Sequence, residues 1–370
     1  MENALKLDTV VLAENGEAIV ILDQTLLPNE TKYLTLDKAE DIWEAIYKLR
    51  VRGAPAIGVT GAYGYYVLAR QFETEDMDEF VAKCTEMMEY LNSSRPTAVN
   101  LSWALNRMHA VLLSEKEGKT VEQMKERLKE EANAIREEDI QISRSIGAYG
   151  FELLEELGKG VGIMTHCNAG TLATAKYGTA LAPVYIALEH GWDPRKDLHV
   201  YCDETRPLLQ GARLSAYEMQ TAGVDTYVQC DNMASYTMKS GKVGIIFVGC
   251  DRVAANGDFA NKIGTSGVAI IAKHYGIPFY VCAPSSTIDM TMESGDEIHI
   301  EQRKPEEVTE MWYKERMAPE GVGVVNPAFD VTDHSLVTGI ITEKGIAHAP
   351  FKEAFEKMGI KPVTKYVDKK

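Results

Sequence analysis

Two residues with reactive side chains each follow a short apolar run. Cys167 comes after GVGIMTH, and Asp251 comes after VGIIFVGC. A thiol suits nucleophilic or proton-transfer chemistry, and a carboxyl group at a strand end suits acid–base work. The alternatives are a cysteine that only packs in a strand end and an aspartate that only forms a turn. These two residues alone leave both alternatives open.

The residues after Cys167, NAGTLATAKYGTALAP, are expected to enter a helix. The free N–H groups at a helix start favour phosphate or a thiolate, whereas apolar burial favours the neutral thiol. His166 adjoins Cys167, but neighbouring residues of a strand point to opposite faces. A Cys–His nucleophilic pair is therefore not expected.

Several loops carry groups that bind anions. Arg206, Gln210 and Arg213 lie close together in ETRPLLQGAR. The other candidates precede expected helices or follow a turn: Arg52, Gly53 and Ala54 in VRGAPAIG, Arg95 in SSRPTAVN, and Asn261 and Lys262 in ANGDFANKIGT. Each loop alone could be a solvated helix entry. Together they would supply the local positive charge that an anionic substrate requires.

The six cysteines, five of which end predicted strands, form no CxxC pair and no zinc-type cluster. We interpret the strand-end cysteines other than Cys167 as small packing residues. No GxxxxGK[ST] loop, GxSxG elbow or HExxH helix is present, and no GxGxxG follows a strand. The sequence therefore gives no support for nucleotide hydrolysis, esterase chemistry, zinc proteolysis or dinucleotide binding.

The elements that must position these residues form an α/β protein. Asn15-Gly16 between two β-rich runs predicts a hairpin, and helical spacing follows as far as residue 140. A long charged helix, with a possible interruption near residues 136–141, is expected to connect the two halves of the chain. Beyond it, six apolar runs alternate with helical segments, which predicts a Rossmann-like parallel sheet. We expect a hairpin-and-helix domain at 1–140 and a Rossmann-like catalytic domain at 141–370.

Composition excludes several classes of protein. The chain has 370 residues, 45% hydrophobic and 25% charged, as in globular proteins. Its 39 Lys+Arg against 55 Asp+Glu give a net charge of −16, which disfavours binding to nucleic acid or to an anionic membrane. The chain also lacks a long apolar run and the layout of a signal peptide, so a cytoplasmic protein with reduced thiols is expected.

These motifs, taken together, resemble the methylthioribose-1-phosphate isomerase family. The resemblance spans about residues 20 to 346 and is carried, in order, by LDQTLLPNE, VRGAPAIG, NSSRPTAVNLSWAL, THCNAGTLAT, YGTALAP, DETRPLLQGARLSAYEM, DNMASYTM, GCDRVAANGDFANKIGT, PFYVCAP and VNPAFDVT…TGIITEKG. One departure is that Cys250 and Cys282 stand where many members carry a small apolar residue. This change conserves size.

The resemblance implies an aldose–ketose isomerase of methionine salvage, which converts 5-methylthioribose 1-phosphate into 5-methylthioribulose 1-phosphate. It implies Cys167 and Asp251 as the catalytic pair, with Asp251 as the proton donor. It also implies substrate binding by Arg52, Gly53, Ala54, Arg95, Gln210, Asn261 and Lys262. No metal or organic cofactor is implied, and the expected assembly is a homodimer.

The same scaffold resembles isomerases of 5-deoxyribose 1-phosphate and ribose 1,5-bisphosphate, and regulatory subunits of translation initiation factor 2B. The group at C5 of the sugar is thus left open. For Asp251 to donate a proton near neutrality, its pKa must lie well above the usual value of about 3.9. We expect a dry pocket to raise it.

Overall fold

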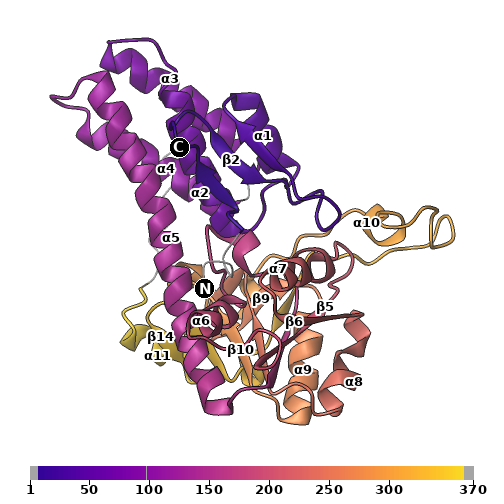
Figure 1. The fold of residues 1–370 in the computed structure, drawn as a ribbon. Helices are drawn as coiled ribbons and strands as arrows, with labels where there is room; N and C mark the ends of the chain where they lie inside the picture. The colour runs from indigo at the N-terminus through magenta and orange to yellow at the C-terminus, as the bar shows by residue number, and fades with distance from the viewer. Residues whose placement is uncertain (1–6, 97, 362–370) are drawn as a thin grey trace. The chain divides into compact units, whose positions relative to one another are not determined.

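The computed structural model describes residues 7–96 and 98–361. The chain forms two compact units (Figure 1). We call residues 7–141 together with 170–178 the N-terminal unit, and residues 142–169 together with those from 179 onward the C-terminal unit. The division falls within the charged segment where the sequence predicts the boundary. Two continuous ranges cannot represent it, however, because residues 170–178 belong to the N-terminal unit.

The N-terminal unit begins with an antiparallel sheet of β1 (Val10–Leu12), β2 (Ile19–Leu22) and β3 (Tyr33–Leu36). The hairpin predicted at Asn15-Gly16 is confirmed, because β1 pairs with β2 around this turn. Gly16 has a φ of 71° and donates its N–H to the Ala13 carbonyl at 2.7 Å. Glycine suits this position because it adopts the left-handed backbone without steric cost.

Helices complete this unit. They are α1 (Ala39–Tyr47), α2 (Ala54–Ala69), α3 (Met77–Asn92), α4 (Val99–Glu115) and the first part of α5 (Val121–Leu157). Almost every residue of α2 is buried, as expected for a helix that is apolar on all sides. At Gly61 a Cβ atom would come within 2.7 Å of Leu101 Cδ1, so the absence of a side chain allows α2 to pack closely against α4.

The long charged segment is one uninterrupted helix of 37 residues, α5. The possible interruption near residues 136–141 is not found. This stretch contains neither proline nor glycine and consists largely of good helix formers. Within the N-terminal unit, Glu131 of α5 pairs with Arg127 at 2.8 Å and with Arg107 of α4 at 2.6 Å. These ion pairs hold α5 against α4.

A seven-stranded sheet forms the centre of the C-terminal unit, in the order β14-β13-β10-β7-β4-β5-β6. The strands are β4 (Val161–Thr165), β5 (Leu198–Asp203), β6 (Asp225–Gln229), β7 (Ile245–Val248), β10 (Phe279–Cys282), β13 (Gly339–Thr342) and β14 (Gly345–Ala347). All neighbours are parallel except β13 and β14. The predicted parallel sheet is therefore confirmed, and each of the six predicted runs contributes a strand.

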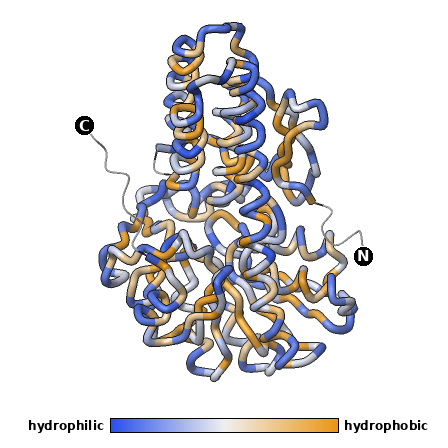
Figure 2. Tube along the Cα trace, turned by 90° about the vertical axis from the view of Figure 1, so that its left-hand side faces the viewer, coloured by the Kyte–Doolittle hydropathy of each residue, from blue (hydrophilic) through white to orange (hydrophobic). Residues whose placement is uncertain are grey.

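Helices cover this sheet. They are the second part of α5 together with α6 (Ala182–Glu189), α7 (Ala216–Thr221), α8 (Ala234–Lys239), α9 (Thr265–Tyr275) and α11 (Phe351–Lys357). Every residue of β7, β10 and β13 is buried, which explains why these strands read as continuous apolar runs. Figure 2 shows strands of the sheet as largely hydrophobic stretches.

A smaller sheet was not predicted. It consists of β11 (Ile288–Asp289), β8 (Arg252–Ala254), β9 (Phe259–Lys262) and β12 (Phe329–Thr332), in that order. The segment DRVAANGDFANK, interpreted from the sequence as a Gly/Asn-rich loop, is the β8–β9 hairpin of this sheet. A short helix, α10 (Glu306–Thr309), lies on an arm between β11 and β12. Among the described helices, none has the length and apolar composition that crossing a membrane requires.

Candidate functional site

Cys167 and Asp251 follow two neighbouring strands of the central sheet. β4 and β7 are parallel, and Met164 pairs with Ile246. Cys167 lies three residues after Met164, and Gly249 lies three residues after Ile246, so both residues stand just beyond the ends of their strands. At Gly249 a Cβ atom would come within 2.6 Å of the Ala169 side chain, so the two strand ends remain in contact. The carboxyl ends of adjacent strands border the ligand crevice of such sheets, and both candidate residues lie there.

The backbone of Cys167 is held in an unusual conformation. Its φ is 68°, and its side chain is buried, with the residue 8% exposed. The Cys167 N–H donates to Thr205 Oγ1 at 2.7 Å, and its carbonyl accepts from Ser215 Oγ at 2.7 Å. Thr205 itself has a φ of 63°, which is rare for a β-branched residue. Such strain persists only where surrounding contacts impose it, and it concentrates at functional sites.

The next residue, Asn168, is fixed by a buried carboxylate. Its Nδ2 donates to Glu218 Oε1 at 2.5 Å and to Ser215 Oγ at 3.1 Å. The hydroxyl group of Tyr185 donates to the other Glu218 oxygen at 2.9 Å. Glu218 lies on α7 with no exposed surface. Three elements, β4, α6 and α7, are therefore joined through this one carboxylate.

The prediction that a helix follows Cys167 is wrong. A single 3₁₀ turn, Thr171–Ala173, is followed by irregular backbone until α6 begins at Ala182. Long-range hydrogen bonds determine this conformation: Thr9 Oγ1 donates to the Thr171 carbonyl at 2.7 Å, and Gln24 Nε2 donates to the Leu172 carbonyl at 2.8 Å. The chain therefore does not begin a helix at Cys167.

Asp251 lies at the start of the β8–β9 hairpin. Its N–H donates to the Ala260 carbonyl at 2.9 Å. In contrast to the expected dry pocket, Asp251 is exposed. Because the fold alone does not bury this carboxyl group, the water exclusion required for a raised pKa must arise in another way.

Asn261 and Lys262 lie on the same hairpin and are buried, at 5% and 9% exposure. Asn261 Nδ2 donates to Thr265 Oγ1 at 3.0 Å. The Lys262 ammonium group lies 4.2 Å from the centre of the Phe329 ring, within the range of a cation–π contact. A buried ammonium group and a buried amide are costly to desolvate, so their presence here favours a polar binding role.

Gln210 follows β5 and is 8% exposed. Its Oε1 is buried and accepts no hydrogen bond from the residues that the structure describes. The next residue, Gly211, lies so close to β5 that a Cβ atom would come within 1.7 Å of the Asp203 carbonyl oxygen. A buried amide oxygen without a donor is costly, and a substrate hydroxyl group would satisfy it.

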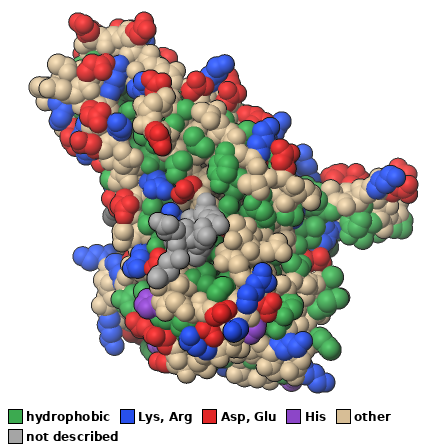
Figure 3. All heavy atoms as spheres, in the orientation of Figure 1, with side chains coloured by type: hydrophobic (Ala, Val, Ile, Leu, Met, Phe, Trp, Pro, Cys, Tyr) green, Lys and Arg blue, Asp and Glu red, His purple; other side chains and the backbone are tan. Residues whose placement is uncertain are grey.

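Arg206 and Arg213, which the sequence groups with Gln210, contact the arm that carries α10. Arg206 Nη2 donates to the Val308 carbonyl at 2.8 Å, and the Arg213 guanidinium group lies 4.6 Å from the Trp312 ring centre. Figure 3 shows hydrophobic side chains gathered along this arm. These contacts favour a role for the two arginines in holding the arm.

The remaining predicted site residues belong to the N-terminal unit. Gly53 has a φ of 90°, and a Cβ atom there would come within 2.3 Å of the Ala173 carbonyl oxygen. Arg52 precedes it, and Ala54 begins α2. Arg95 precedes α4 and is partly buried. Gly53 therefore packs against residues 170–178, the segment that follows Cys167–Ala169 in the chain.

Sequence reasoning missed the partners of His166. Its Nδ1 lies 3.1 Å from Asp203 Oδ2, and its Nε2 lies 2.8 Å from the Ile263 carbonyl oxygen. Both ring nitrogens are thus engaged away from the thiol, in agreement with the expectation against a Cys–His pair. The partners are 37 and 97 residues away in sequence. A histidine beside the reactive cysteine was the available signal, but it does not identify such distant partners.

Among the other strand-end cysteines, Cys202 and Cys282 fit the packing interpretation, whereas for Cys230, which is exposed, it is wrong. None of the six cysteines forms a disulfide bond. Cys202 and Cys282 have no exposed surface, and burial raises the pKa of both thiols. Burial likewise raises the pKa of Cys250. Cys250 and Cys282 are the two positions where many family members carry a small apolar residue. A neutral buried thiol behaves as a small hydrophobic group.

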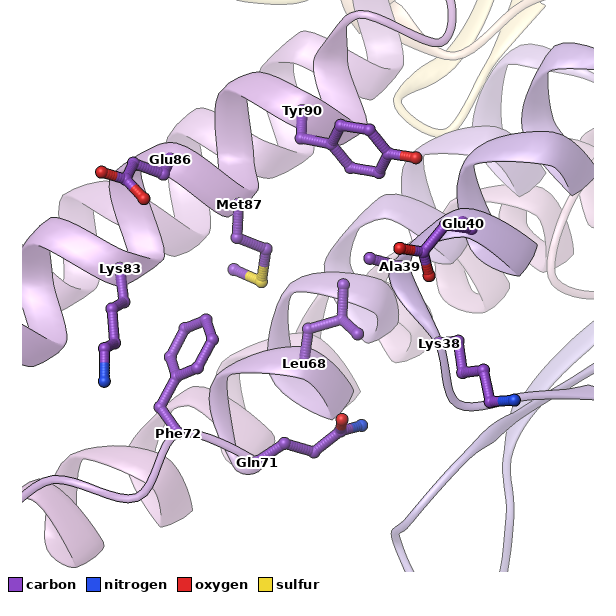
Figure 4. Close-up of a pocket in the computed structure, with 10 residues that line it drawn as sticks. All are labelled: Lys38, Ala39, Glu40, Leu68, Gln71, Phe72, Lys83, Glu86, Met87 and Tyr90. Atoms are coloured by element: carbon purple, nitrogen blue, oxygen red, sulfur yellow. The ribbon is translucent and has the colours of Figure 1, made fainter.

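A groove in the N-terminal unit, about 630 Å³ in volume, contains none of the predicted site residues (Figure 4). Figure 4 shows Leu68, Phe72 and Met87 pointing into it, with charged side chains around them. One of these, Lys83, pairs with Glu79 at 2.8 Å. The groove lacks the combination of reactive and anion-binding groups found at the carboxyl ends of the central strands.

The chain is similar to several known proteins in sequence and in structure. The model of the initiation factor 2 subunit family matches residues 50–349. A methylthioribose-1-phosphate isomerase from Symbiobacterium thermophilum is 58% identical over 353 residues, covering 95% of this chain and 96% of that protein. A 5-deoxyribose 1-phosphate isomerase from Petrotoga mobilis is 52% identical over 349 residues, covering 94% and 98%. The structure of 5-methylthioribose 1-phosphate isomerase from Pyrococcus horikoshii OT3 matches with a TM-score of 0.90 at 41% identity, covering 97% of each chain.

Proposed function

The chain belongs to the initiation factor 2 subunit family, and from this premise we propose that it converts 5-methylthioribose 1-phosphate into 5-methylthioribulose 1-phosphate. The observation that carries the proposal is the 58% identity to an isomerase of that name along nearly the full length of both chains. The position of Cys167 and Asp251 after adjacent parallel strands supports it. Such a reaction is a step of methionine salvage.

The chemistry explains why an acid is required. The anomeric oxygen of the substrate carries phosphate, so the ring cannot open to a free aldehyde. Breaking the bond between C1 and the ring oxygen instead requires a proton on that oxygen and leaves positive character at C1. Asp251 is the proposed donor of this proton, as general acid.

A hydrogen must then move from C2 to C1 while O2 becomes a ketone oxygen. In one route it moves as a hydride, and the hydroxyl proton on O2 passes to a base. In the other, a base removes the proton from C2 to give an enol phosphate, and C1 then receives a proton while the O2 hydroxyl group loses its own. Cys167 is the proposed base in either route. Solvent deuterium at C1 of the product would indicate the enol route, and its absence a direct hydride shift.

The substrate contacts are proposed residue by residue. In the C-terminal unit, Gln210 supplies an amide oxygen that has no donor among the described residues, and Asn261 and Lys262 supply a buried amide and a buried positive charge. Arg52, Gly53, Ala54 and Arg95, in the N-terminal unit, remain predictions from the family motifs. A dianionic phosphate requires such local donors, because the whole chain carries a net charge of −16.

We also propose a cytoplasmic homodimer. Six cysteines without a disulfide bond fit a reducing compartment. The edge strand β6 and the adjoining α8 expose large apolar side chains, among them Tyr227, Val228 and Tyr236. An exposed apolar patch along a strand edge is typical of an interaction surface.

The decisive experiment is a kinetic comparison of three substrates on the purified chain. We expect the highest kcat/KM with 5-methylthioribose 1-phosphate, lower values with 5-deoxyribose 1-phosphate and ribose 1,5-bisphosphate, and no change on adding a chelator. A preference for 5-deoxyribose 1-phosphate would reassign the substrate. Absence of turnover on all three would favour a regulatory subunit, and loss of activity with chelator would contradict the metal-free chemistry.

A further inference from the structure

We propose that His166 is a positioning residue, which fixes the Cys167 strand end relative to the hairpin that carries Asp251, Asn261 and Lys262. The inference rests on the proposed function, because it assigns His166 a task in that reaction. His166 does not contact the reacting atoms in this proposal. It acts through two hydrogen bonds to different elements of the C-terminal unit.

The imidazole ring links β4 to two other elements. It has no exposed surface. Nδ1 lies 3.1 Å from Asp203 Oδ2 at the end of β5, and Nε2 lies 2.8 Å from the carbonyl oxygen of Ile263, just after β9. A carbonyl oxygen only accepts, so Nε2 must carry a hydrogen. The side chain beside Cys167 is thus tied directly to the backbone beside Lys262.

The Asp203 side of this link is itself fixed. Gln229 Nε2 donates to Asp203 Oδ1 at 2.8 Å, and Thr237 Oγ1 donates to Gln229 Oε1. Burial disfavours the charged imidazolium, but the hydrogen bond and charge of Asp203 outweigh burial and raise the pKa of His166. A hydrogen-bond partner at each ring nitrogen keeps the ring in one orientation.

The Ile263 side is built to receive the ring. At Gly264, which has a φ of 104°, a Cβ atom would come within 2.8 Å of His166 Cε1. The Gly264 N–H donates to Asp330 Oδ2 at 2.8 Å. Thr265 Oγ1 accepts from Asn261 and donates to the Lys262 carbonyl at 2.7 Å. Movement of the Ile263 carbonyl would therefore shift both proposed substrate-binding residues.

The hydrogen bonds of His166 help to hold the strained backbone at Cys167. A φ of 68° is maintained only by surrounding contacts, and His166 is the residue immediately before it. Loss of the hydrogen bond from His166 to the Ile263 carbonyl would let the end of β4 and the end of β9 move apart. A misplacement of about 1 Å can cost on the order of 100-fold in rate.

Two substitutions separate the hydrogen bonds of His166. An Asn amide overlays the Nδ1 position and can still contact Asp203, whereas a Gln amide overlays the Nε2 position and can donate to Ile263. For His166→Asn we expect kcat to fall on the order of 100-fold, with KM changed less than about threefold. For His166→Gln we expect kcat within about fivefold of wild type.

His199 offers a matched control. It forms a similar pair in the same sheet, with Nδ1 2.7 Å from Asp225 Oδ2, but it is partly exposed. His199→Asn should leave kcat unchanged. Circular dichroism and thermal melting confirm that each variant is folded at the assay temperature. If His166→Asn does not fold, Gly264→Ala, which displaces the ring, should show the same fall in kcat.

The outcomes are distinct. Full kcat in folded His166→Asn, or equal losses in the Asn and Gln variants, would overturn the positioning role. A loss of kcat in His199→Asn as large as in His166→Asn would also overturn it, by showing a general effect on the sheet. If the wild-type chain does not isomerise 5-methylthioribose 1-phosphate, the proposed function fails, and it fails independently of these variants.

Discussion

Cys167 and Asp251 have opposite surroundings, and this difference bears on their proposed roles. Cys167 is buried with both backbone polar groups bonded, whereas Asp251 is exposed. If the phosphate of the bound substrate lies close to the carboxyl group, its negative charge raises the pKa of the acid. We therefore propose that the substrate itself raises the pKa of Asp251. The general acid would then be protonated only when the substrate is bound.

Replacement of Asp251 by Asn should remove the acid and retain the size of the side chain. We expect kcat to fall by at least about 100-fold, because general acid catalysis is typically worth 100- to 10,000-fold. Substrate affinity, measured by isothermal titration calorimetry, should be little changed. Asp296→Asn, at another exposed aspartate, serves as the control. A folded Asp251→Asn variant with wild-type kcat would remove Asp251 from the mechanism.

Replacement of Gln210 should raise the stability of the fold and weaken substrate binding. Its buried Oε1 has no donor among the described residues, so Gln210→Met removes an unsatisfied polar atom. We expect stability to rise by about 1 kcal/mol in thermal unfolding and KM to rise about tenfold. A higher melting temperature with unchanged KM would exclude Gln210 from substrate binding.

The segment 170–178 shows how one element depends on distant partners. It follows Cys167–Ala169 but belongs to the N-terminal unit, where Asp139 Oδ2 of α5 accepts the Ala175 N–H at 2.6 Å. Burial raises the pKa of Asp139 to about 7. One titratable carboxyl group thus helps to hold the segment that directly follows the proposed catalytic thiol in the chain.

The stability of the chain should depend on the protonation of Asp139. Between about pH 4 and pH 7 the folded state keeps a proton that the unfolded state releases, so this group makes stability fall as pH rises. In Asp139→Asn the amide oxygen can still accept from Ala175, but it cannot ionise. The variant should match wild type near pH 4 and exceed it by about 1–3 kcal/mol at pH 8.

Denaturant unfolding at several pH values measures this difference. Glu137→Gln, at an exposed position on the same helix, is the control and should show no comparable pH-dependent gain. An Asp139→Asn variant that is less stable than wild type at pH 8 would show that the ionised carboxylate stabilises the fold.

Assembly concerns the molecule as a whole. In the seven-stranded sheet β6 is an edge strand, and Tyr227 and Val228 on it are exposed. Unprotected edge strands invite pairing with another chain, and a charged side chain on the edge opposes it. The proposed homodimer is therefore expected to use this edge.

The wild-type chain should sediment as a dimer in analytical ultracentrifugation. Val228→Lys should weaken dimerisation by at least about tenfold, because burying a lysine in an apolar contact is costly. Val325→Lys, at an exposed position on the arm that carries α10, should not change the sedimentation. A wild-type monomer at micromolar concentration would contradict the homodimer.

Local patterns in the sequence determined much of the fold. Buried parallel strands appear as apolar runs, and Asn15-Gly16 marks a hairpin by its own backbone preference. The position of Cys167 and Asp251 directly after such runs was enough to place both at strand ends. The small sheet of β8, β9, β11 and β12 was missed because strands such as RVA, FANK and FDVT mix polar with apolar residues. The four-residue strands β7, β10 and β13, in contrast, lie in continuous apolar runs.

Tertiary structure decided the rest. The residues after Cys167 have a pattern compatible with a helix, but hydrogen bonds to Thr9 and Gln24, about 150 residues away in sequence, hold them in an irregular conformation. The exposure of Asp251 and the two partners of His166 likewise depend on which strands become neighbours. Periodicity reports only the local secondary-structure preference of a segment, whereas these features depend on contacts between segments that are distant in the chain.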